Sequence, residues 1–286
     1  MLLFGAVGLV LVAFAANSLL CRLALEQEAI DPMSFTAIRL VAGALMLAAC
    51  SAAGRKTSPT GDAVAWWPAI SLFGYAILFS VAYQWLSAAT GALALFGAVQ
   101  ITMMIFAKAR GESVRGLQWL GFVLANAGLL YLLLPGIESP SPLGLVMMFG
   151  SGVSWGVYSA LGKTAKDPIL ATTINFRRAA LFAIPICFFS ASQLRAEAIG
   201  VVLACVSGAI TSGLGYVGWY SVLPRLSTSQ ASLAQLLVPV IAAVGAVLFL
   251  GEELRLQLLV AGALILGGIA IPFVSDPSAT SNRKKN

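Results

Sequence analysis

The chain has 286 residues, of which 59% are hydrophobic and only 10% are charged, and its formal net charge is +6. Its mean hydropathy is +0.93. These values exclude an ordinary soluble globular domain and predict an all-α integral membrane protein.

Apolar stretches long enough to cross a bilayer recur along the whole chain. A hydrocarbon core about 30 Å thick needs roughly 20 apolar residues in a helix. The connections are short, and none has the length or polarity of a catalytic or nucleic-acid-binding domain. The sequence predicts ten spans: 3–21, 33–52, 66–87, 90–108, 116–134, 143–162, 169–190, 197–222, 227–250 and 256–274.

Basic residues are distributed unevenly over the connections. The odd-numbered connections hold only Arg22, Arg195 and Arg255. By the positive-inside rule, the even-numbered connections and both termini are predicted to be cytoplasmic, as an even number of spans also requires. The even-numbered connections and the C-terminal tail hold Arg55, Lys56, Lys108, Arg110, Arg115, Lys163, Lys166, Arg225, Arg283, Lys284 and Lys285.

The N-terminal stretch is expected to remain as the first span. It begins MLLFGAVGLV and lacks the basic segment that opens a secretory signal peptide. The four cysteines lie in or at the ends of spans without CxxC spacing, which argues against disulfides and against a metal site.

The two halves of the chain repeat each other. The repeating unit holds five spans, an odd number, so the second copy must enter the membrane from the opposite side. The expected architecture is therefore two inverted five-helix repeats, 1–137 and 138–286, the second with a short basic cytoplasmic tail. The aligned positions are Gly111-Glu112 with Gly251-Glu252, Arg115 with Arg255, Leu93-Ala94 with Leu233-Ala234, Gly128 with Gly268, and Asp31-Pro32 with Asp167-Pro168.

Several of these features together mark a family. A Gly-Glu pair ends one span, a Gly-rich span follows, Asp-Pro precedes an Arg-bearing span, and Trp219-Tyr220 precedes a Pro-centred helix. The chain resembles the ten-helix EamA branch of the drug/metabolite transporter superfamily over nearly its whole length, above all in residues 236–268. Within that branch it looks like the bacterial aromatic amino-acid exporters, the YddG-like group. The resemblance implies two five-helix bundles around a central cavity, and an exporter of small amphipathic solutes in the bacterial inner membrane.

The sequence is also compatible with other functions. The solute can instead be a drug, an organic cation or another metabolite, because no short motif separates these exporters within the branch. A channel and a membrane-embedded enzyme are the competing classes. The expected partners are a small-molecule substrate and the lipid bilayer, with no nucleic acid, cofactor or obligate protein partner.

Trp155 lies near the centre of the sixth span with Tyr158 one turn further on, and both are candidates for binding the solute. The alternative is a tight helix contact, because Gly152 and Gly156 allow another backbone to approach.

The third span carries a stripe of aromatic residues at intervals of four, Tyr75, Phe79 and Tyr83, which predicts one aromatic helix face. Ring faces attract ammonium groups and other rings, and phenolic hydroxyls offer hydrogen bonds. An ordinary packed face is the alternative.

Polar groups inside the spans complete the predicted lining. Pro239 leaves the carbonyl of Gln235 without its helical partner, and the Gln235 amide lies at the same level. Gln100, Asn17 and Trp219 are further candidates. The first copy has Val99 and Leu95 where the second has Pro239 and Gln235, so the halves are expected to contribute unequally.

Three basic residues lie within spans: Arg39 in the second, and Arg177 and Arg178 in the seventh. They are expected to be gates or anion-attracting mouths, Arg39 toward the outer side and the pair toward the inner side. Snorkelling to the headgroups is the alternative.

The sequence contains no catalytic constellation. It has no His, and all its Asp and Glu fall in connections, tails or span ends, so no enzyme activity or metal site is predicted. Proton relays and Na⁺ sites in transporters commonly use buried acids or His. We therefore expect transport down the solute's own gradient, by uniport or exchange. Ion coupling through backbone carbonyls, or through Glu112 and Glu252 at the span ends, is the alternative.

Overall fold

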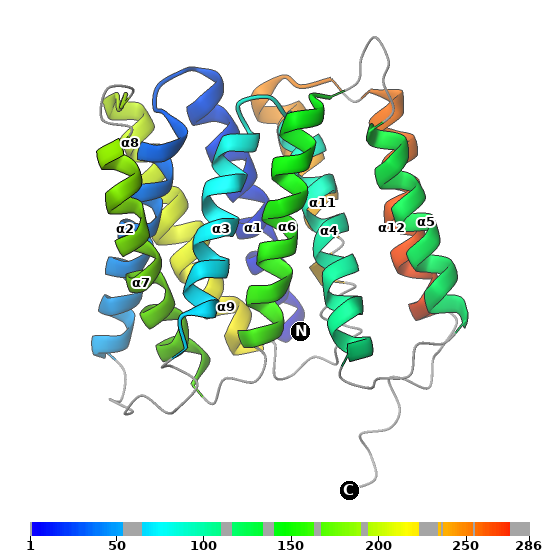
Figure 1. Cartoon of the computed structure of the whole chain (residues 1–286), viewed down its shortest axis with the longest axis horizontal. Helices are drawn as coiled ribbons and strands as arrows, with labels where there is room; N and C mark the ends of the chain where they lie inside the picture. The colour runs from blue at the N-terminus through cyan, green and yellow to red at the C-terminus, as the bar shows by residue number, and fades with distance from the viewer. Residues whose placement is uncertain are drawn as a thin grey trace, which may run out of the picture.

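The helices of this protein stand side by side as a bundle in the computed structural model (Figure 1). The structure describes residues 2–53, 65–109, 116–133, 140–162, 167–189, 194–222, 234–235, 237–253 and 255–274. Within these ranges the regular structure is helical, and the only β-type pairing is an isolated bridge between Ile30 and Ala196. Helices suit this composition because they satisfy their own backbone hydrogen bonds in lipid.

The first half of the chain forms helices that overlap the five predicted spans, and α1 continues to Glu26, beyond the predicted end at residue 21. They are α1 (Leu2–Glu26), α2 (Pro32–Ala53), α3 (Trp67–Ala82), α4 (Ala88–Ala109) and α5 (Gly116–Leu133).

The second half contains two stretches in which an α-helix passes into a π-helix. Its elements are α6 (Pro142–Gly162), α7 (Pro168–Phe189), α8 (Ala198–Val206), η3 (Ser207–Leu214), α9 (Gly215–Val222), α11 (Leu237–Gly245), η5 (Ala246–Leu250) and α12 (Leu256–Val274). Segments α8, η3 and α9 follow one another without a break. The beginning of the predicted span 227–250 lies outside the described residues, as do Gly111, Glu112 and Arg115 of the predicted repeat.

Six of the described helical segments are long and apolar enough to cross a membrane: 5–26, 32–52, 88–106, 142–162, 169–186 and 198–222. Shorter apolar helices cover 67–82, 119–128, 237–250 and 256–268. The integral membrane character is therefore plain, and the count of ten spans stays a prediction.

The repeated Asp-Pro pairs begin two helices in the same way. The Asp31 carboxylate accepts hydrogen bonds from the backbone N–H of Met33 and of Ser34, both at 2.9 Å. Asp167 accepts one from the backbone N–H of Leu170 at 3.0 Å. Proline then occupies the first helical position, where its missing N–H costs nothing. The aligned pairs are thus the N-terminal caps of α2 and α7.

Five pairings dominate the packing of the bundle: α5 with α12, α3 with α6, α4 with α6, α2 with α7, and α2 with η3. Helix α1 packs against α8, η3, α9 and α11. In Figure 1, α5 and α12 form one edge of the bundle, and α1 begins at the same rim at which α12 ends. This arrangement encloses side chains from α1, α3, α4, α6, η3 and α9 at the centre.

The two glycines of the sixth span form the close helix contact that one interpretation predicted. A Cβ on Gly152 would meet the Leu95 carbonyl oxygen and would lie 2.7 Å from the Ala98 Cβ, and one on Gly156 would lie 2.7 Å from the Thr102 Cβ. Both glycines therefore face α4 and let the two backbones approach.

Candidate functional site

A small chamber lies at the centre of the bundle among aromatic side chains. It encloses about 20 Å³, room for about one water molecule. A solute can therefore enter only when helices move apart. The central chamber is lined by Phe14, Asn17 and Ser18 of α1, Tyr75 and Phe79 of α3, Leu95 and Phe96 of α4, Trp155 of α6, Thr211 and Ser212 of η3, and Tyr216 of α9.

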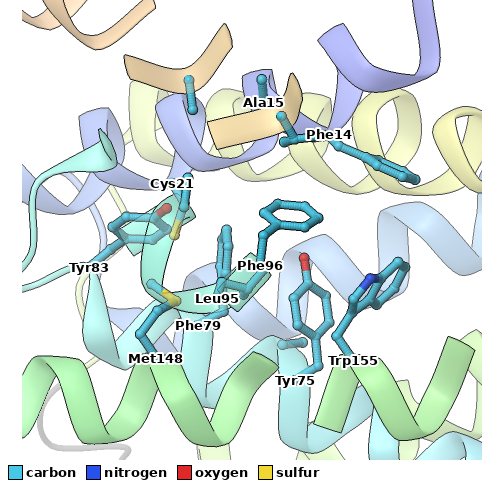
Figure 2. Packing of buried hydrophobic residues seen from close by; sticks show 14 of the residues in the cluster. Phe14, Ala15, Cys21, Tyr75, Phe79, Tyr83, Leu95, Phe96, Met148 and Trp155 are labelled. Carbon is cyan, nitrogen blue, oxygen red and sulfur yellow. The ribbon is translucent and has the colours of Figure 1, made fainter. Parts of the chain in front are cut away.

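Trp155 contacts several rings of the aromatic wall. Its ring centroid lies 5.0 Å from that of Tyr75, 4.9 Å from that of Tyr216 and 6.0 Å from that of Phe14. Figure 2 shows Tyr75 and Trp155 rising side by side toward Phe14 on the opposite wall. Trp155 thus lines the chamber while Gly152, on the same helix, packs against α4. The two interpretations of this motif are compatible, since they concern different faces of α6.

A hydrogen-bonded network joins α1, α3 and η3 beside the rings. Asn17 donates through Nδ2 to the Tyr75 hydroxyl at 3.2 Å, and its Oδ1 accepts from Ser207 at 2.7 Å and from Thr211 at 3.2 Å. The π-helical segment η3 thereby turns hydroxyl groups toward the centre, and π-helical turns often occur at functional sites. Asn17, which was predicted as a site residue from its polarity alone, links α1 to α3 and η3 at this wall.

Arg39 is buried directly behind the chamber wall. The residue is only 2% exposed, and its Nη2 donates to the Tyr75 hydroxyl at 2.8 Å while Nε donates to Ser212 Oγ at 3.1 Å. The guanidinium carbon lies 5.0 Å from the ring centroids of both Tyr75 and Phe79. Snorkelling toward the headgroups does not describe this burial, and the side chain contacts the lining residues Tyr75, Phe79 and Ser212 from behind.

The two other intramembrane arginines lie apart from the chamber. Arg177 is exposed, whereas Arg178 donates to the Ala65 carbonyl at 2.8 Å and stacks over Trp66 with its guanidinium carbon 4.7 Å from the ring centroid. Both line a separate hollow of about 340 Å³ together with Ile174 and Leu181. Their predicted gating role therefore concerns a place distinct from the central chamber.

The other aromatic candidates extend the cluster beyond the chamber lining. Tyr83 makes an edge contact with Phe79 at 4.7 Å between centroids, and Trp219 does so with Phe14 at 5.9 Å. Tyr158 lies 5.6 Å from Trp155 between ring centroids. These residues support the walls from behind.

The two glutamines predicted for the lining do not line the chamber. Gln100 is half-buried on α4. Gln235 is buried, and its Oε1 accepts no hydrogen bond from the described residues.

Sequence reasoning missed several lining residues. Tyr216 belongs to the glycine-rich run 213–218, where helix packing was the expected role, and Phe14 is one apolar residue among many in α1. The hydroxyl cluster of Ser207, Thr211 and Ser212 was a usable signal, because polar residues at intervals of four and five interrupt an otherwise apolar span.

A third hollow, which is polar and about 530 Å³ in volume, lies near the end of the bundle where α4 and α12 begin. Glu252 is its central acid: its carboxylate accepts hydrogen bonds from the backbone N–H of Ala88 at 2.7 Å and of Ala89 at 3.4 Å. Arg22 of α1 lies 3.7 Å from the same carboxylate and donates to the Tyr83 carbonyl at 3.0 Å. We call this hollow the polar vestibule. Glu252 thus connects α1, the N-terminus of α4 and the segment between η5 and α12.

The described part of the chain brings together no group of three or more His, Cys, Asp or Glu side chains that could hold a metal ion. Cys21, Cys50 and Cys205 are free thiols, and the side chain of Cys187 lies outside the described set.

Known proteins resemble this chain in sequence and in fold. The EamA-like transporter family matches the chain twice, over residues 3–134 and 142–274. An uncharacterized protein of Pseudomonas aeruginosa is 48% identical over 92% of this chain and 91% of its own length. The threonine/homoserine exporter RhtA of Escherichia coli K12 is 29% identical over 68% of this chain and 66% of its own. A solved crystal structure with 20% identity superposes with a TM-score of 0.66, covering 93% of this chain and 98% of that one, which shows a shared fold.

Proposed function

Because the chain belongs to the EamA-like transporter family, within the drug/metabolite transporter superfamily, we propose that it exports small amphipathic metabolites, amino acids with aromatic or apolar side chains among them. The observation that carries this proposal is the central chamber, where an aromatic wall and a buried cation lie together. Such a wall suits an apolar or aromatic side chain, and polar groups beside it suit an amino-acid head group. The threonine/homoserine exporter among the relatives also favours amino acids as the substrate class.

The proposed architecture has ten spans in two inverted repeats, 1–137 and 138–286, around the central chamber. Three observations support it. The family matches each half separately, Asp-Pro caps begin both α2 and α7, and the pairings are reciprocal, since α3 and α4 pack on α6 as α8 and α11 pack on α1. We place both termini in the cytoplasm and the protein in a bacterial inner membrane.

The proposed mechanism is alternating access. The central chamber has almost no free volume, so a passing solute must separate the helices on one side and then on the other. Each described acid lies near an end of a helix, which leaves the chamber without an acidic group to bind a coupling proton or Na⁺. We therefore propose uniport or exchange of the solute.

Flux in proteoliposomes tests this function. We expect saturable uptake of labelled phenylalanine, tryptophan or methionine, and counterflow when the same amino acid is loaded inside. Transport of polyols or sugars with no flux of these amino acids would contradict the substrate class. Flux that never saturates and shows no counterflow would indicate a channel instead.

A gradient experiment tests the absence of ion coupling. With equal amino acid on both sides, an imposed pH or Na⁺ gradient should produce no net accumulation. Accumulation that collapses together with the gradient would contradict uniport and exchange.

A further inference from the structure

Arg39 brings a full positive charge into the interior without an acidic partner among the described residues. A guanidinium stays charged at any physiological pH, and burying a charge costs several kcal/mol unless it is paired. Every described acid is committed elsewhere or lies near a helix end: Glu26 and Glu252 with Arg22, Glu28 and Glu197 with Arg195, Asp31 and Asp167 as caps, and Glu253 beside the polar vestibule.

Hydrogen-bond donors remain unused around the same charge. Among the described residues, Arg39 Nη1 has no hydrogen-bond partner, although Nε and Nη2 of the same guanidinium each donate one bond. The indole N–H of Trp155 and the Tyr216 hydroxyl are likewise buried without a hydrogen-bond partner in the described part of the chain. Buried donors nearly always have a hydrogen-bond partner in folded proteins. This cluster of donors can therefore bind an acceptor that a solute brings.

The amide oxygen of this network is already occupied, and the Tyr75 and Ser212 hydroxyl oxygens already accept hydrogen bonds from Arg39. Asn17 Oδ1 accepts from both Ser207 and Thr211. The wall therefore carries free donors on Trp155 and Tyr216, and the positive charge of Arg39 lies directly behind it. The other lining side chains are ring faces, aliphatic groups and the polar groups of Asn17, Ser18, Thr211 and Ser212.

Resting on the proposed export function, we infer that the central chamber selects solutes that carry a carboxylate, and that Arg39, with the Trp155 N–H and the Tyr216 hydroxyl, forms the carboxylate-recognition site. A carboxylate supplies two oxygens for charge-assisted bonds and neutralises the guanidinium. Arg39 already touches Tyr75, Phe79 and Ser212 of the lining. The same opening that admits a solute therefore brings its carboxylate within reach of the guanidinium.

This assignment separates the substrate classes that the family leaves open. An organic cation can stack on the rings but meets the repulsion of Arg39, with no acid in the described chamber wall to offset it. An amino acid satisfies both groups, because its ammonium can lie over a ring face while its carboxylate neutralises the arginine. The proposal thus favours carboxylates with an apolar body over cationic drugs.

A set of matched ligands tests the inference directly. Phenylalanine, 3-phenylpropanoate, phenylalaninamide and phenethylamine share one ring and differ in their charged groups. Binding to the purified full-length protein in detergent is measured by calorimetry, and flux is measured in proteoliposomes. We expect the two carboxylates to bind and the two amines to bind at least tenfold more weakly. Amines that bind as tightly as phenylalanine would overturn the inference.

Substitutions then locate the site. Arg39→Gln should weaken phenylalanine binding roughly ten- to hundredfold and abolish the preference for carboxylates, whereas Arg195→Gln, an exposed arginine in the connection before α8, should change neither. Tyr216→Phe keeps the ring and removes only the hydroxyl, and Trp155→Phe removes the indole N–H together with part of the ring. Each should weaken carboxylate binding about three- to tenfold, and Tyr216→Phe isolates the loss of a donor. These two variants decide the matter if Arg39→Gln fails to fold. Carboxylate preference that survives all three substitutions would refute the site.

The two proposals fail in different ways. Flux of phenethylamine without binding of carboxylates would leave an amphipathic exporter standing and remove the carboxylate site. Carboxylate binding that depends on Arg39, without flux of any ligand, would support the site and contradict export.

Discussion

Glu252→Ala should loosen the end of the bundle at the polar vestibule. The Glu252 carboxylate holds the first two amides of α4 at 2.7 and 3.4 Å and lies 3.7 Å from Arg22, and its side chain is 10% exposed. Hydrogen bonds to a charged group contribute about 1.5–3 kcal/mol. If the helices separate at this end during transport, the loss of these hydrogen bonds should increase the population of the conformation that is open at the polar vestibule roughly ten- to hundredfold.

Cys21 provides the assay for this opening. Its side chain is fully buried in the closed structure, adjacent in the chain to Arg22 and close to Tyr83. With Cys50, Cys187 and Cys205 replaced by serine, the rate at which a small thiol reagent labels Cys21 reports how often this end opens.

The neighbouring acid supplies the control. Glu253 lines the same polar vestibule, so Glu253→Ala removes an equal charge without releasing α4. We expect faster Cys21 labelling for Glu252→Ala and an unchanged rate for Glu253→Ala. Equal rates in both variants, or no change in either, would refute the role of Glu252 as a tether.

Three further substitutions test the packing around these sites. Gly152→Ala should lower the free energy of unfolding by about 1–3 kcal/mol, because the new methyl meets the α4 backbone, whereas Gly8→Ala, which meets nothing within 4 Å, should be neutral in thermal unfolding. Trp155→Ala should cost about 3–5 kcal/mol and reduce amino-acid flux, since the ring is both buried and part of the chamber; a fully stable variant with normal flux would contradict both roles. Gly251→Ala should cost about 1–2 kcal/mol through backbone strain alone, because φ is 65° with open space around it, and unchanged thermal unfolding would exclude that strain.

Much of the fold could be predicted from local properties of the sequence. Membrane insertion depends on hydropathy summed over about 20 residues, and the described helices overlap the predicted spans, although their ends differ from the predicted ones. The Asp31 and Asp167 caps are likewise local, because each side chain bonds to amides two or three residues ahead. Aromatic residues at intervals of four in α3 correctly indicated a continuous face, in which Tyr75 contacts Phe79 and Phe79 contacts Tyr83.

The candidate site depends on which helix faces point toward the centre of the bundle. In a soluble protein the alternation of apolar and polar residues predicts the inward face, whereas in a membrane protein this signal is weak. Lipid tails and a protein interior are both apolar, so a membrane helix carries little periodic contrast between its two faces. Phe14 and Leu9 look alike in the sequence, yet one lines the chamber and the other is 75% exposed.

Long-range pairs were decided by the tertiary structure alone. The sequence placed Arg39 at a depth where burial and snorkelling are both possible; packing of α2 against η3 decides between them, since Ser212, 173 residues away, accepts its hydrogen bond. Glu252 likewise reaches the amide of Ala88 across 164 residues. Composition and local capping thus determined that this chain is a helical membrane protein and where α2 and α7 begin. The partners of its few buried polar groups were determined by packing, because such groups must find hydrogen bonds wherever the assembled bundle provides them.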